Sequence, residues 1–418
     1  MIPEGIVARI LTESVSKRKT LRVVAGEFFA RRPHLSYAKP VVRILSLGVA
    51  RNYMFLDYLI MAAGYDLPSD PYKLNLARVL TYEVVFQGVK KPRLKKVASK
   101  SGLDDEAPKT LSSIDLEREK RNLVKKGLIH VAYSIPEWIL KELRECHVPR
   151  LGELLESLLK DPVRWLRVST HRISREGLVK RLSKRGIETA PDSDFEDMLR
   201  VVRGKGLGST PEYKEGLYVV QDKASALVAH MVGEAQVTVD FTGAPGVKTT
   251  HLAQLGVKTS IAGDIRPRRA VEVKKLSRRL GLSPYVHVVV WDAQHPPLRR
   301  VRITAVVDPT CSNLGRLRYE PEIKMWLAPR DIEKLSKIQK TLLRAVLEAL
   351  PKGVRVYYSV CSWSPKEAEE VVRSVEDLAE PSEPPIKLGV EGGVKGSQRL
   401  YPHIHETLGF FVVPLTRV

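Results

Sequence analysis

From residue 216 to its end, the chain alternates short apolar runs with stretches whose apolar residues recur every three to four positions. The short runs predict buried strands, and the periodic stretches predict helices. Strands that alternate with helices are typical of a doubly wound, mostly parallel sheet. The expected strands are residues 236–241, 259–264, 286–292, 303–309 and 354–360. Ligands of such sheets bind beyond the carboxyl ends of the strands, so the residues there are the first candidates for function.

Two of these strands end close to thiols. Cys361 follows strand 354–360, and Asp308 and Cys311 follow strand 303–309. A thiol can be a nucleophile, a metal ligand or a buried apolar side chain, and a single cysteine is most often the last of these. Both strands are expected to deliver their ends to one edge of the sheet. Two thiols and a carboxylate at that edge indicate a site of chemistry.

Three further carboxylates indicate a nucleoside pocket at the same edge. Asp240, Asp264 and Asp292 stand at the ends of the first three predicted strands. An acid in this position can accept hydrogen bonds from ribose hydroxyls or from an exocyclic amine. Each aspartate alone is an ordinary strand end, but three in succession favour a nucleoside ligand.

The turn 240–248, DFTGAPGVK, joins the first strand to a helix expected from about residue 249. Its small residues let the backbone approach a ligand, and the helix N-terminus presents N–H groups. The spacing matches neither the dinucleotide G-x-G-x-x-G fingerprint nor the Walker A loop.

Charge and cysteine content narrow the class of protein. The 418 residues include 69 Lys and Arg against 48 Asp and Glu, a formal net charge of +21. This excess suits a polyanionic partner such as RNA, although a basic protein without a nucleic-acid role stays an alternative. Three cysteines in so long a chain favour a reducing, cytoplasmic location. The scarcity of Asn and Gln resembles thermophile composition.

No membrane segment is expected. The first residues lack an apolar core followed by a small-residue cleavage site. Residues 44–63 are apolar, but Arg51, Asn52 and Asp57 interrupt them, so we predict a buried helix there.

The chain is expected to fold as three parts. Residues 1–132 read as an all-α domain, residues 133–215 as linker helices and a small α+β module, and residues 216–418 as the α/β domain. The basic stretch 88–100 is either a phosphate-contacting segment or a solvated loop, and 101–115 is predicted to be a surface linker. The glycine-rich stretch 203–209 predicts a hairpin turn rather than a phosphate loop, and Cys146 is read as structural.

The motifs of the last part resemble those of the Nop/Sun (RsmB-like) family of RNA cytosine-C5 methyltransferases. Residues 240–253 resemble its D-x-x-A-A-P-G-G-K-T-T-H-x-A motif, and residues 308–315 (DPTCSNLG) its D-x-P-C-S-G-x-G motif. Residues 358–370 are similar to Y-S-T-C-S-x-x-P-E-E-N-E, and residues 399–411 to R-x-x-P-H-x-H-x-T-x-G-F-F. Residues 216–225 resemble the opening helix of the family's catalytic domain.

This resemblance implies a multidomain fold. It comprises a helical, NusB-like RNA-binding domain, a ferredoxin-like (RRM-like) middle module and a Rossmann-like domain that uses S-adenosyl-L-methionine (SAM). The implied catalytic residues are Cys361, Cys311, Asp308 and Lys248. The implied cofactor-binding residues are Gly243, Ala244, Pro245, Gly246, Lys248, Asp264, Arg269, Asp292 and Asp308. Cys361 would attack C6 of cytosine, and Cys311 would assist in losing the C5 proton.

The chain departs from the family's motifs at a few positions. Thr310 replaces a proline, Asn313 and Val247 replace glycines, and Ala368 departs from the E-E-N-E run. The chain keeps both thiols, Lys248 and Asp308. The departures therefore affect the expected RNA target more than the expected methyltransferase activity.

The expected function is formation of 5-methylcytosine in ribosomal RNA. A tRNA substrate and a non-catalytic RNA-binding assembly factor of the same fold are the alternatives. A DNA cytosine methyltransferase would use the cysteine of the fourth motif and lack the second thiol. No metal is expected, since two cysteines fifty residues apart and His403 and His405 lack metal-ligand spacing. The protein is expected to be a monomer.

Overall fold

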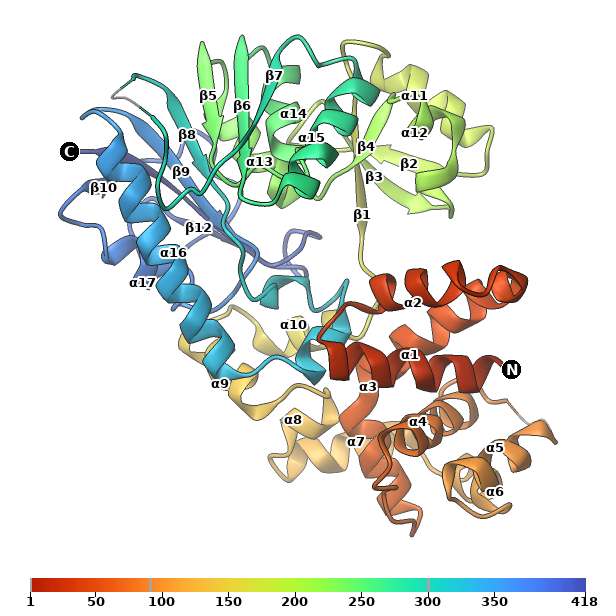
Figure 1. The fold of residues 1–418 in the computed structure, drawn as a ribbon. Helices are drawn as coiled ribbons and strands as arrows, with labels where there is room; N and C mark the ends of the chain where they lie inside the picture. Colours follow the sequence, from red (N-terminus) through yellow and green to blue (C-terminus); the bar gives the residue numbers. More distant parts are fainter. Residues whose placement is uncertain (1, 90–91, 299–300) are drawn as a thin grey trace. The chain divides into compact units, whose positions relative to one another are not determined.

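The computed structural model describes residues 2–89, 92–298 and 301–418 and contains two compact units (Figure 1). The first comprises Met1–Asp161 and Arg316–Pro329, and the second Pro162–Gly315 and Arg330–Val418. The segment Arg316–Pro329 therefore leaves the α/β part of the sequence and packs with the N-terminal helices, which sequence patterns did not indicate. The three expected domain boundaries stay predictions.

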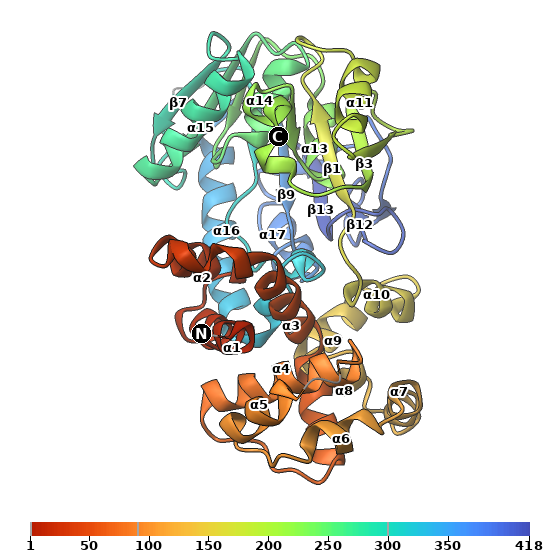
Figure 2. The ribbon, with the colours of Figure 1, turned by 90° about the vertical axis from the view of Figure 1, so that its right-hand side faces the viewer.

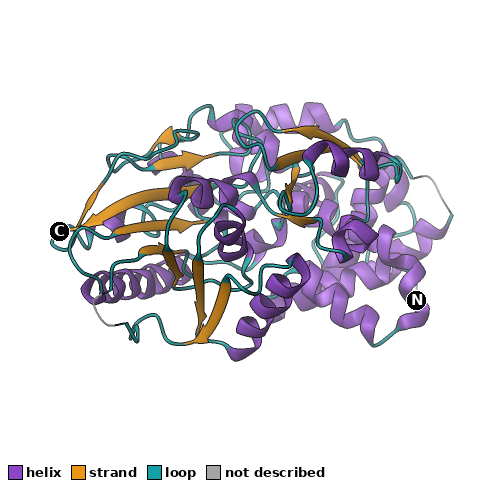
Figure 3. Ribbon diagram, turned by 90° about the horizontal axis from the view of Figure 1, so that it is seen from above, coloured by secondary structure: helices purple, strands orange, loops and turns teal. Residues whose placement is uncertain are grey.

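The described residues of the first unit form helices and turns without a strand (Figure 3). Its α-helices are α1 (Pro3–Lys17), α2 (Leu21–Ala30), α3 (Lys39–Ala62), α4 (Pro71–Val85), α5 (Arg93–Ser101), α6 (Ala107–Ser112), α7 (Leu116–Lys125), α8 (Ile129–Ala132), α9 (Glu137–Glu145) and α10 (Leu151–Leu158). Two 3₁₀ helices, η1 (Pro33–Ala38) and η4 (Pro321–Met325), complete it.

Local sequence explains where several of these helices begin. Proline stands in the first turn of α1, α3 and α4, where its missing N–H costs no hydrogen bond. Asp70 also caps α4, because its side chain accepts a hydrogen bond from the Lys73 N–H at 2.8 Å.

Helix α3 is the buried helix predicted within residues 44–63. Its polar residues make ion pairs: Asp57 with Arg78 at 2.7 Å, and Arg51 with Asp161 at 2.8 Å. Among the described residues, no helix is long and apolar enough to cross a membrane.

Two expectations for the first unit were wrong in part. The predicted linker 101–115 contains α6, because Ala107 and Leu111 bury their side chains. In the basic stretch 88–100, residues 90 and 91 lie outside the described residues, and most of the remainder forms α5 rather than a loop. Arg93 of α5 pairs with the buried carboxylates of Glu4 at 3.0 Å and Glu83 at 2.9 Å.

The second unit begins with a ferredoxin-like module. Its antiparallel sheet has the order β2 (Glu188–Pro191), β3 (Met198–Arg203), β1 (Arg164–Val168), β4 (Tyr218–Val220). Helices α11 (Arg175–Ser183) and α12 (Pro211–Lys214) accompany it.

Two further expectations fail in this module. The stretch 203–209 is no hairpin turn, since it connects β3 to the 3₁₀ helix η2 (Leu207–Ser209) with positive φ at Gly204 and Gly206. Residues 216–225 are not one helix either. They form β4, which pairs with β1, and the first turn of α13 (Lys223–Val232).

The larger sheet is the predicted doubly wound sheet. Its strands are β5 (Val237–Asp240), β6 (Thr259–Asp264), β7 (Val286–Val290), β8 (Thr304–Val307), β9 (Arg355–Val360), β10 (Ala379–Pro381), β11 (Val390–Glu391), β12 (Gln398–Leu400) and β13 (Phe410–Arg417). The order is β11-β12-β13-β9-β8-β5-β6-β7, with β10 paired to β13. From β9 to β7 all neighbours are parallel, and β13 is antiparallel to β9.

Helices cover both faces of this sheet (Figures 1 and 2). Helices α13, α14 (Val247–Gln254) and α15 (Pro267–Leu280) lie on one face, and α16 (Pro329–Ala349) and α17 (Glu369–Arg373) on the other. Two apolar clusters fill the two interfaces, one with residues of α14 and α15 and one with residues of α16 and α17. Because β5, β6, β7, β8 and β9 are parallel, their carboxyl ends meet at one edge.

Candidate active site

The two predicted thiols lie together at the edge of the sheet. Cys361 follows β9, Cys311 lies in the turn after β8, and their Sγ atoms are 3.1 Å apart. The turn is held to the strand end by a hydrogen bond from the Gly315 N–H to the Cys361 carbonyl at 3.0 Å. Cys146 lies in the other unit, at the end of α9. The structure therefore assembles the pair that the strand ends predict.

Asn313 contacts one of these thiols directly. The Cys361 Sγ donates to its Oδ1 at 3.0 Å, and its Nδ2 donates to the Cys311 carbonyl at 3.3 Å. Asn313 has a φ of 60°, in the left-handed region that asparagine tolerates better than most residues. The departure from the family's glycine thus adds a polar contact to Cys361 while the turn is kept.

A partly buried ion pair lies beside the thiols. The Lys248 Nζ donates to the Asp308 Oδ2 at 2.5 Å. Asp308 is fixed further by the Ser359 hydroxyl at 3.2 Å from its Oδ1 and by its own N–H, which donates to Thr242 Oγ1 at 3.0 Å. Burial lowers the pKa of Lys248, but the charge and hydrogen bond of Asp308, with the charges of Asp240 and Cys361, outweigh this and raise it. Lys248 is therefore a stable cation.

The electrostatic setting of Cys311 favours its protonated thiol. Its pKa lies well above the ordinary value, first because of the hydrogen bond with Cys361, then because of burial, and then because of the charges of Cys361 and Glu367. Cys311 thus keeps its proton beside the other sulfur at neutral pH.

Glu367 ties the two thiol-bearing turns together. Its Oε1 accepts from the Ser312 N–H at 2.8 Å and from Gln339 Nε2 at 3.0 Å. Its Oε2 accepts from the hydroxyls of Ser312 and Ser362, each at 2.5 Å. Ser312 and Ser362 directly follow Cys311 and Cys361. One fully buried carboxylate therefore sets the separation of the two cysteine turns.

The turn after β5 has the form expected of a cofactor loop. At Gly243 a Cβ would stand 2.9 Å from the Ala262 Cβ, so a larger residue would displace the neighbouring strand. Gly246 caps α14 with a φ of 96°. Asp240 accepts from Thr249 Oγ1 at 2.8 Å, while its buried Oδ1 has no hydrogen-bond partner among the described residues. An ammonium group, such as the methionyl end of SAM carries, fits that need.

The second strand-end acid is engaged by the turn that follows it. Asp264 accepts from the Arg266 N–H at 2.8 Å, and its Oδ2 lies 3.4 Å from Arg269 Nη1. Arg269 also donates to the carbonyl of Ala244, which links this acid to the cofactor loop. Asp292 accepts from the Gln294 N–H at 2.9 Å, so it shapes its own turn.

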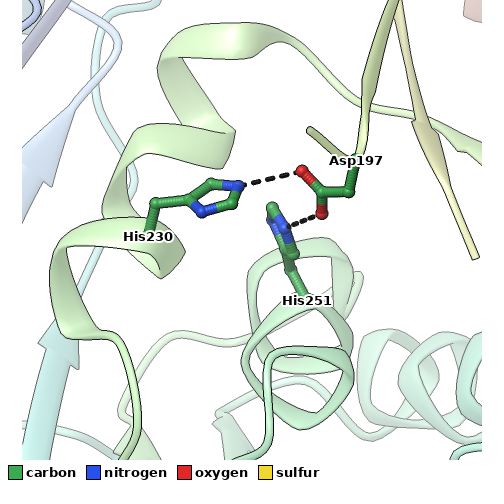
Figure 4. Close-up of side chains that lie close together, drawn as sticks. All are labelled: Asp197, His230 and His251. Carbon is green, nitrogen blue, oxygen red and sulfur yellow. Dashed lines mark hydrogen bonds and ion pairs between the residues drawn. The ribbon is translucent and has the colours of Figure 1, made fainter. Parts of the chain in front are cut away.

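A separate group of metal-ligand residue types lies between the ferredoxin-like module and α13 and α14. Figure 4 shows the rings of His230 and His251 pointing at the carboxylate of Asp197. The His230 Nε2 lies 2.9 Å from Oδ1, and the His251 Nε2 lies 2.7 Å from Oδ2. Gln254 Nε2 donates to the same Oδ2 at 3.1 Å.

Hydrogen bonds account for this group without an ion. Arg167 Nη1 donates to Gln221 Oε1 at 2.9 Å, so the Gln221 Nε2 faces His251 Nδ1 at 3.1 Å as a donor. The proton of His251 therefore sits on Nε2 and is donated to Asp197, whereas a metal would need the lone pair there. Burial, and then the charge of Arg167, lower the pKa of His251 to about 3. That the protein uses no metal stays a prediction.

Sequence reasoning did not single out Arg167 or Glu367. Arg167 Nη1 also donates to the carbonyl of Val247 at 2.9 Å, at the start of the helix that carries Lys248. An arginine between the apolar residues Leu166 and Val168 of β1 was the available signal. For Glu367 the signal was its place in the motif 358–370.

Comparison with known proteins agrees with the motifs. Residues 228–416 match the family described as 16S rRNA methyltransferase RsmB/F, and residues 135–206 match the RsmF/B-like ferredoxin-like domain. Ribosomal RNA small subunit methyltransferase B of Pectobacterium atrosepticum is 27% identical over 369 residues, which cover 87% of this chain and 82% of that protein. The protein of the same name from Klebsiella pneumoniae is 28% identical over 384 residues, 90% and 85% of the two chains.

Solved structures show the same fold. That of PH0851 is 22% identical, with a TM-score of 0.79 over 99% of each chain. NSun6 from Pyrococcus horikoshii, solved with SFG, is also 22% identical, with a TM-score of 0.59 over 64% of this chain and 94% of that one. With two family models matched over more than half of its length, the chain belongs to the RsmB/F family of SAM-dependent methyltransferases.

Proposed function

We propose that this protein methylates C5 of cytosine in RNA, with Cys361 as nucleophile and SAM as methyl donor. The observation that carries the proposal is the pair of sulfur atoms 3.1 Å apart beside the ion pair of Lys248 and Asp308. C5 of cytosine is too weak a nucleophile to take a methyl group from a sulfonium directly. A thiolate must first add to C6, and a second group must later remove the C5 proton.

Cys361 is suited to the first step. Its sulfur forms the bond to C6, and the electrons of the C5–C6 double bond move toward N3, which leaves C5 nucleophilic. A thiolate is the reactive form of such a nucleophile. Asp308, held by Lys248 and Ser359, would accept a hydrogen bond from the exocyclic amine and orient the base.

Cys311 is suited to the last step. The hydrogen bond and charge of Cys361 contribute to keeping its pKa high, and both are lost once the Cys361 sulfur is bonded to C6. Cys311 can then lose its proton to solvent and take the C5 proton. The C5–C6 double bond re-forms, the C6–S bond breaks, and its electron pair returns to Cys361. One proton is released for each methyl group transferred.

SAM supplies an electrophilic methyl group when it is bound. The residues proposed to hold it are the turn Gly243, Ala244, Pro245 and Gly246, the cation Lys248, and the residues Asp264, Arg269, Asp292 and Asp308. Asp240 joins this set, because its unpartnered Oδ1 suits the ammonium group.

The proposed target is ribosomal RNA. The relatives that cover more than four-fifths of this chain are named ribosomal RNA small subunit methyltransferases. The target base must be unstacked to reach the thiols, which favours single-stranded or incompletely assembled RNA.

The direct test is to incubate the purified protein with bulk RNA and methyl-labelled SAM and to analyse the nucleosides. Label in 5-methylcytidine supports the proposal, and bisulfite sequencing then locates the cytosine. Label in another nucleoside would show a methyltransferase of different specificity. Absence of label from rRNA and tRNA alike would favour a non-catalytic assembly factor.

A further inference from the structure

The first unit contains a pocket of about 760 Å³ that the catalytic residues do not use. Its walls come from α2, from the segment between α2 and α3 together with the first turns of α3, and from Arg316–Pro329. Leu21, Phe29, Val42 and Leu47 make much of the lining apolar. The volume lies within the range of roughly 300–1,000 Å³ that small-molecule sites occupy.

Positive charge surrounds this apolar lining. Arg22, Lys39 and Arg43 line the pocket from the N-terminal helices, and all three are exposed. Arg316 lines it from the third wall, where it pairs with Glu320 at 3.0 Å.

The remaining acid of the pocket contributes only part of a negative charge at neutral pH. Glu322 is 1% exposed, and its Oε1 accepts from the Leu21 N–H at 2.8 Å. Burial raises the pKa of Glu322 to about 7, so a fraction of it is protonated at neutral pH. The cations therefore exceed the anions at this pocket.

An exposed aromatic ring belongs to the same segment. Tyr37, in the 3₁₀ helix η1 that lines the pocket, is 73% exposed, and Arg31 and Arg32 precede that helix. Aromatic rings interleaved with cations are the combination that binds single-stranded nucleic acid, since the rings stack on bases and the cations contact phosphates.

We propose that this pocket holds an unpaired base of the substrate RNA, with the neighbouring phosphates on Arg22, Lys39 and Arg43. The proposal rests on the proposed function only in that the substrate is RNA. An apolar lining bordered by cations suits a base that is joined to phosphates. A base within a duplex would have to leave its stack to enter, so the pocket selects single-stranded RNA.

The pocket is not formed by the N-terminal helices alone, because residues of Arg316–Pro329 form its third wall. Arg316 and Tyr319 line the pocket, and Arg316 follows Cys311 by only five residues in the chain. The same stretch of chain thus carries a catalytic thiol and part of the base-binding wall.

Gly26 offers a clean test. It lines the pocket on α2, and a Cβ added to it would meet no atom within 4 Å. Gly26→Leu should fill part of the pocket without threatening the helix, because leucine has the higher helix propensity. Gly152→Leu on α10 is the matched control, since its Cβ would also meet nothing within 4 Å and it does not line the pocket.

The measurement is the affinity of the full chain for a fluorescein-labelled single-stranded RNA oligonucleotide and for the same oligonucleotide in a duplex. We expect Gly26→Leu to weaken single-strand binding about tenfold, the scale of one stacked base, with an unchanged salt slope. Duplex binding and the Gly152→Leu control should not change. Lys39→Gln should instead lower the salt slope by about one.

Unchanged single-strand affinity of a folded Gly26→Leu protein would overturn the proposal, as would an equal loss of duplex binding. An apolar fluorescent dye that enters the pocket and is not displaced by RNA would assign it to an apolar ligand instead. Methyl transfer to RNA by the wild-type protein, measured in parallel, reports on the proposed function separately.

Discussion

Cys311 and Cys361 stand fifty residues apart in the chain, yet their sulfur atoms lie 3.1 Å apart. Parallel pairing of β8 with β9 brings the two turns to one edge, and the carboxylate of Glu367 fixes them to each other. The separation is therefore set by a rigid strand pair and one buried acid. This arrangement allows one sulfur to attack a base while the other stays within reach of it.

The first prediction concerns Glu367. Glu367→Gln replaces a pure acceptor by a group that is half donor, so at least one hydroxyl or N–H near the thiols loses its partner. We expect a loss of roughly 1–3 kcal/mol in the free energy of unfolding. Turnover should fall further than stability alone explains, because the two turns separate.

Removing the negative charge should also lower the pKa of Cys311 and shift the pH profile of adduct release toward lower pH. Single-turnover kinetics at several pH values measure this. Glu370→Gln is the control, since Glu370 is exposed and pairs only loosely with Lys340 at 3.5 Å. If the pH profile of adduct release is the same in Glu367→Gln as in the wild type, the charge of Glu367 does not raise the pKa of Cys311.

The second prediction concerns the cofactor. Asp264→Ala should weaken SAM binding by roughly 1.5–3 kcal/mol, the scale for losing a charge-assisted hydrogen bond. Titration calorimetry checks it, with Glu272→Ala, an exposed acid on α15, as the control. Wild-type affinity in a folded Asp264→Ala protein would show that Asp264 does not bind the cofactor.

The third prediction concerns salt. The net charge of +21 implies that RNA binding releases counterions, so RNA affinity should fall steeply as salt rises. SAM affinity should change little over the same range, because a ligand of small net charge releases few counterions. Fluorescence anisotropy for RNA and calorimetry for SAM give the two slopes. A flat RNA response would mean that the basic surface has another use.

The fourth prediction follows from the buried His251. Its pKa is about 3 in the folded protein and near the ordinary 6.5 in the unfolded chain. The unfolded state therefore binds a proton below pH 6.5 that the folded state does not, and stability falls as pH drops from 6.5 toward 3. The slope approaches roughly 1.4 kcal/mol per pH unit for one such group.

Urea unfolding at pH 7.5 and 5.5 measures this dependence. His251→Gln should lower stability at both values but reduce the difference between them by roughly 1 kcal/mol. His287→Gln on the exposed side of β7 should leave the difference as in the wild type. An unchanged difference in His251→Gln would contradict the buried, neutral state of this ring.

Much of this arrangement follows from local patterns in the sequence. The bounds of β6 match residues 259–264, because the short run of small and apolar residues and the aspartate that ends it are both local signals. The thiol pair was predictable from local signals too: Cys361 directly follows one predicted strand, Cys311 lies in the turn after another, and parallel strands end together.

What local patterns miss are contacts between distant segments. The sequence left the basic stretch 88–100 open as a phosphate-contacting segment or a solvated loop, and neither interpretation includes the contact of Arg93 with the buried Glu4. Glu367 looks like one acid in a charged run, and its role depends on Ser312 from another strand end. Arg316–Pro329 packs with the first unit, and no hydrophobic periodicity in its sequence predicts this.

The central claim is that Cys361 makes the bond to the base and Cys311 helps to break it. The most direct measurement is denaturing electrophoresis of each variant after incubation with RNA and SAM. Cys311→Ala should accumulate an RNA–protein complex that survives denaturation, whereas Cys361→Ala should bind RNA and SAM yet form neither complex nor product. A complex trapped by Cys361→Ala would reverse the two roles, and full turnover by both variants would contradict the claim altogether.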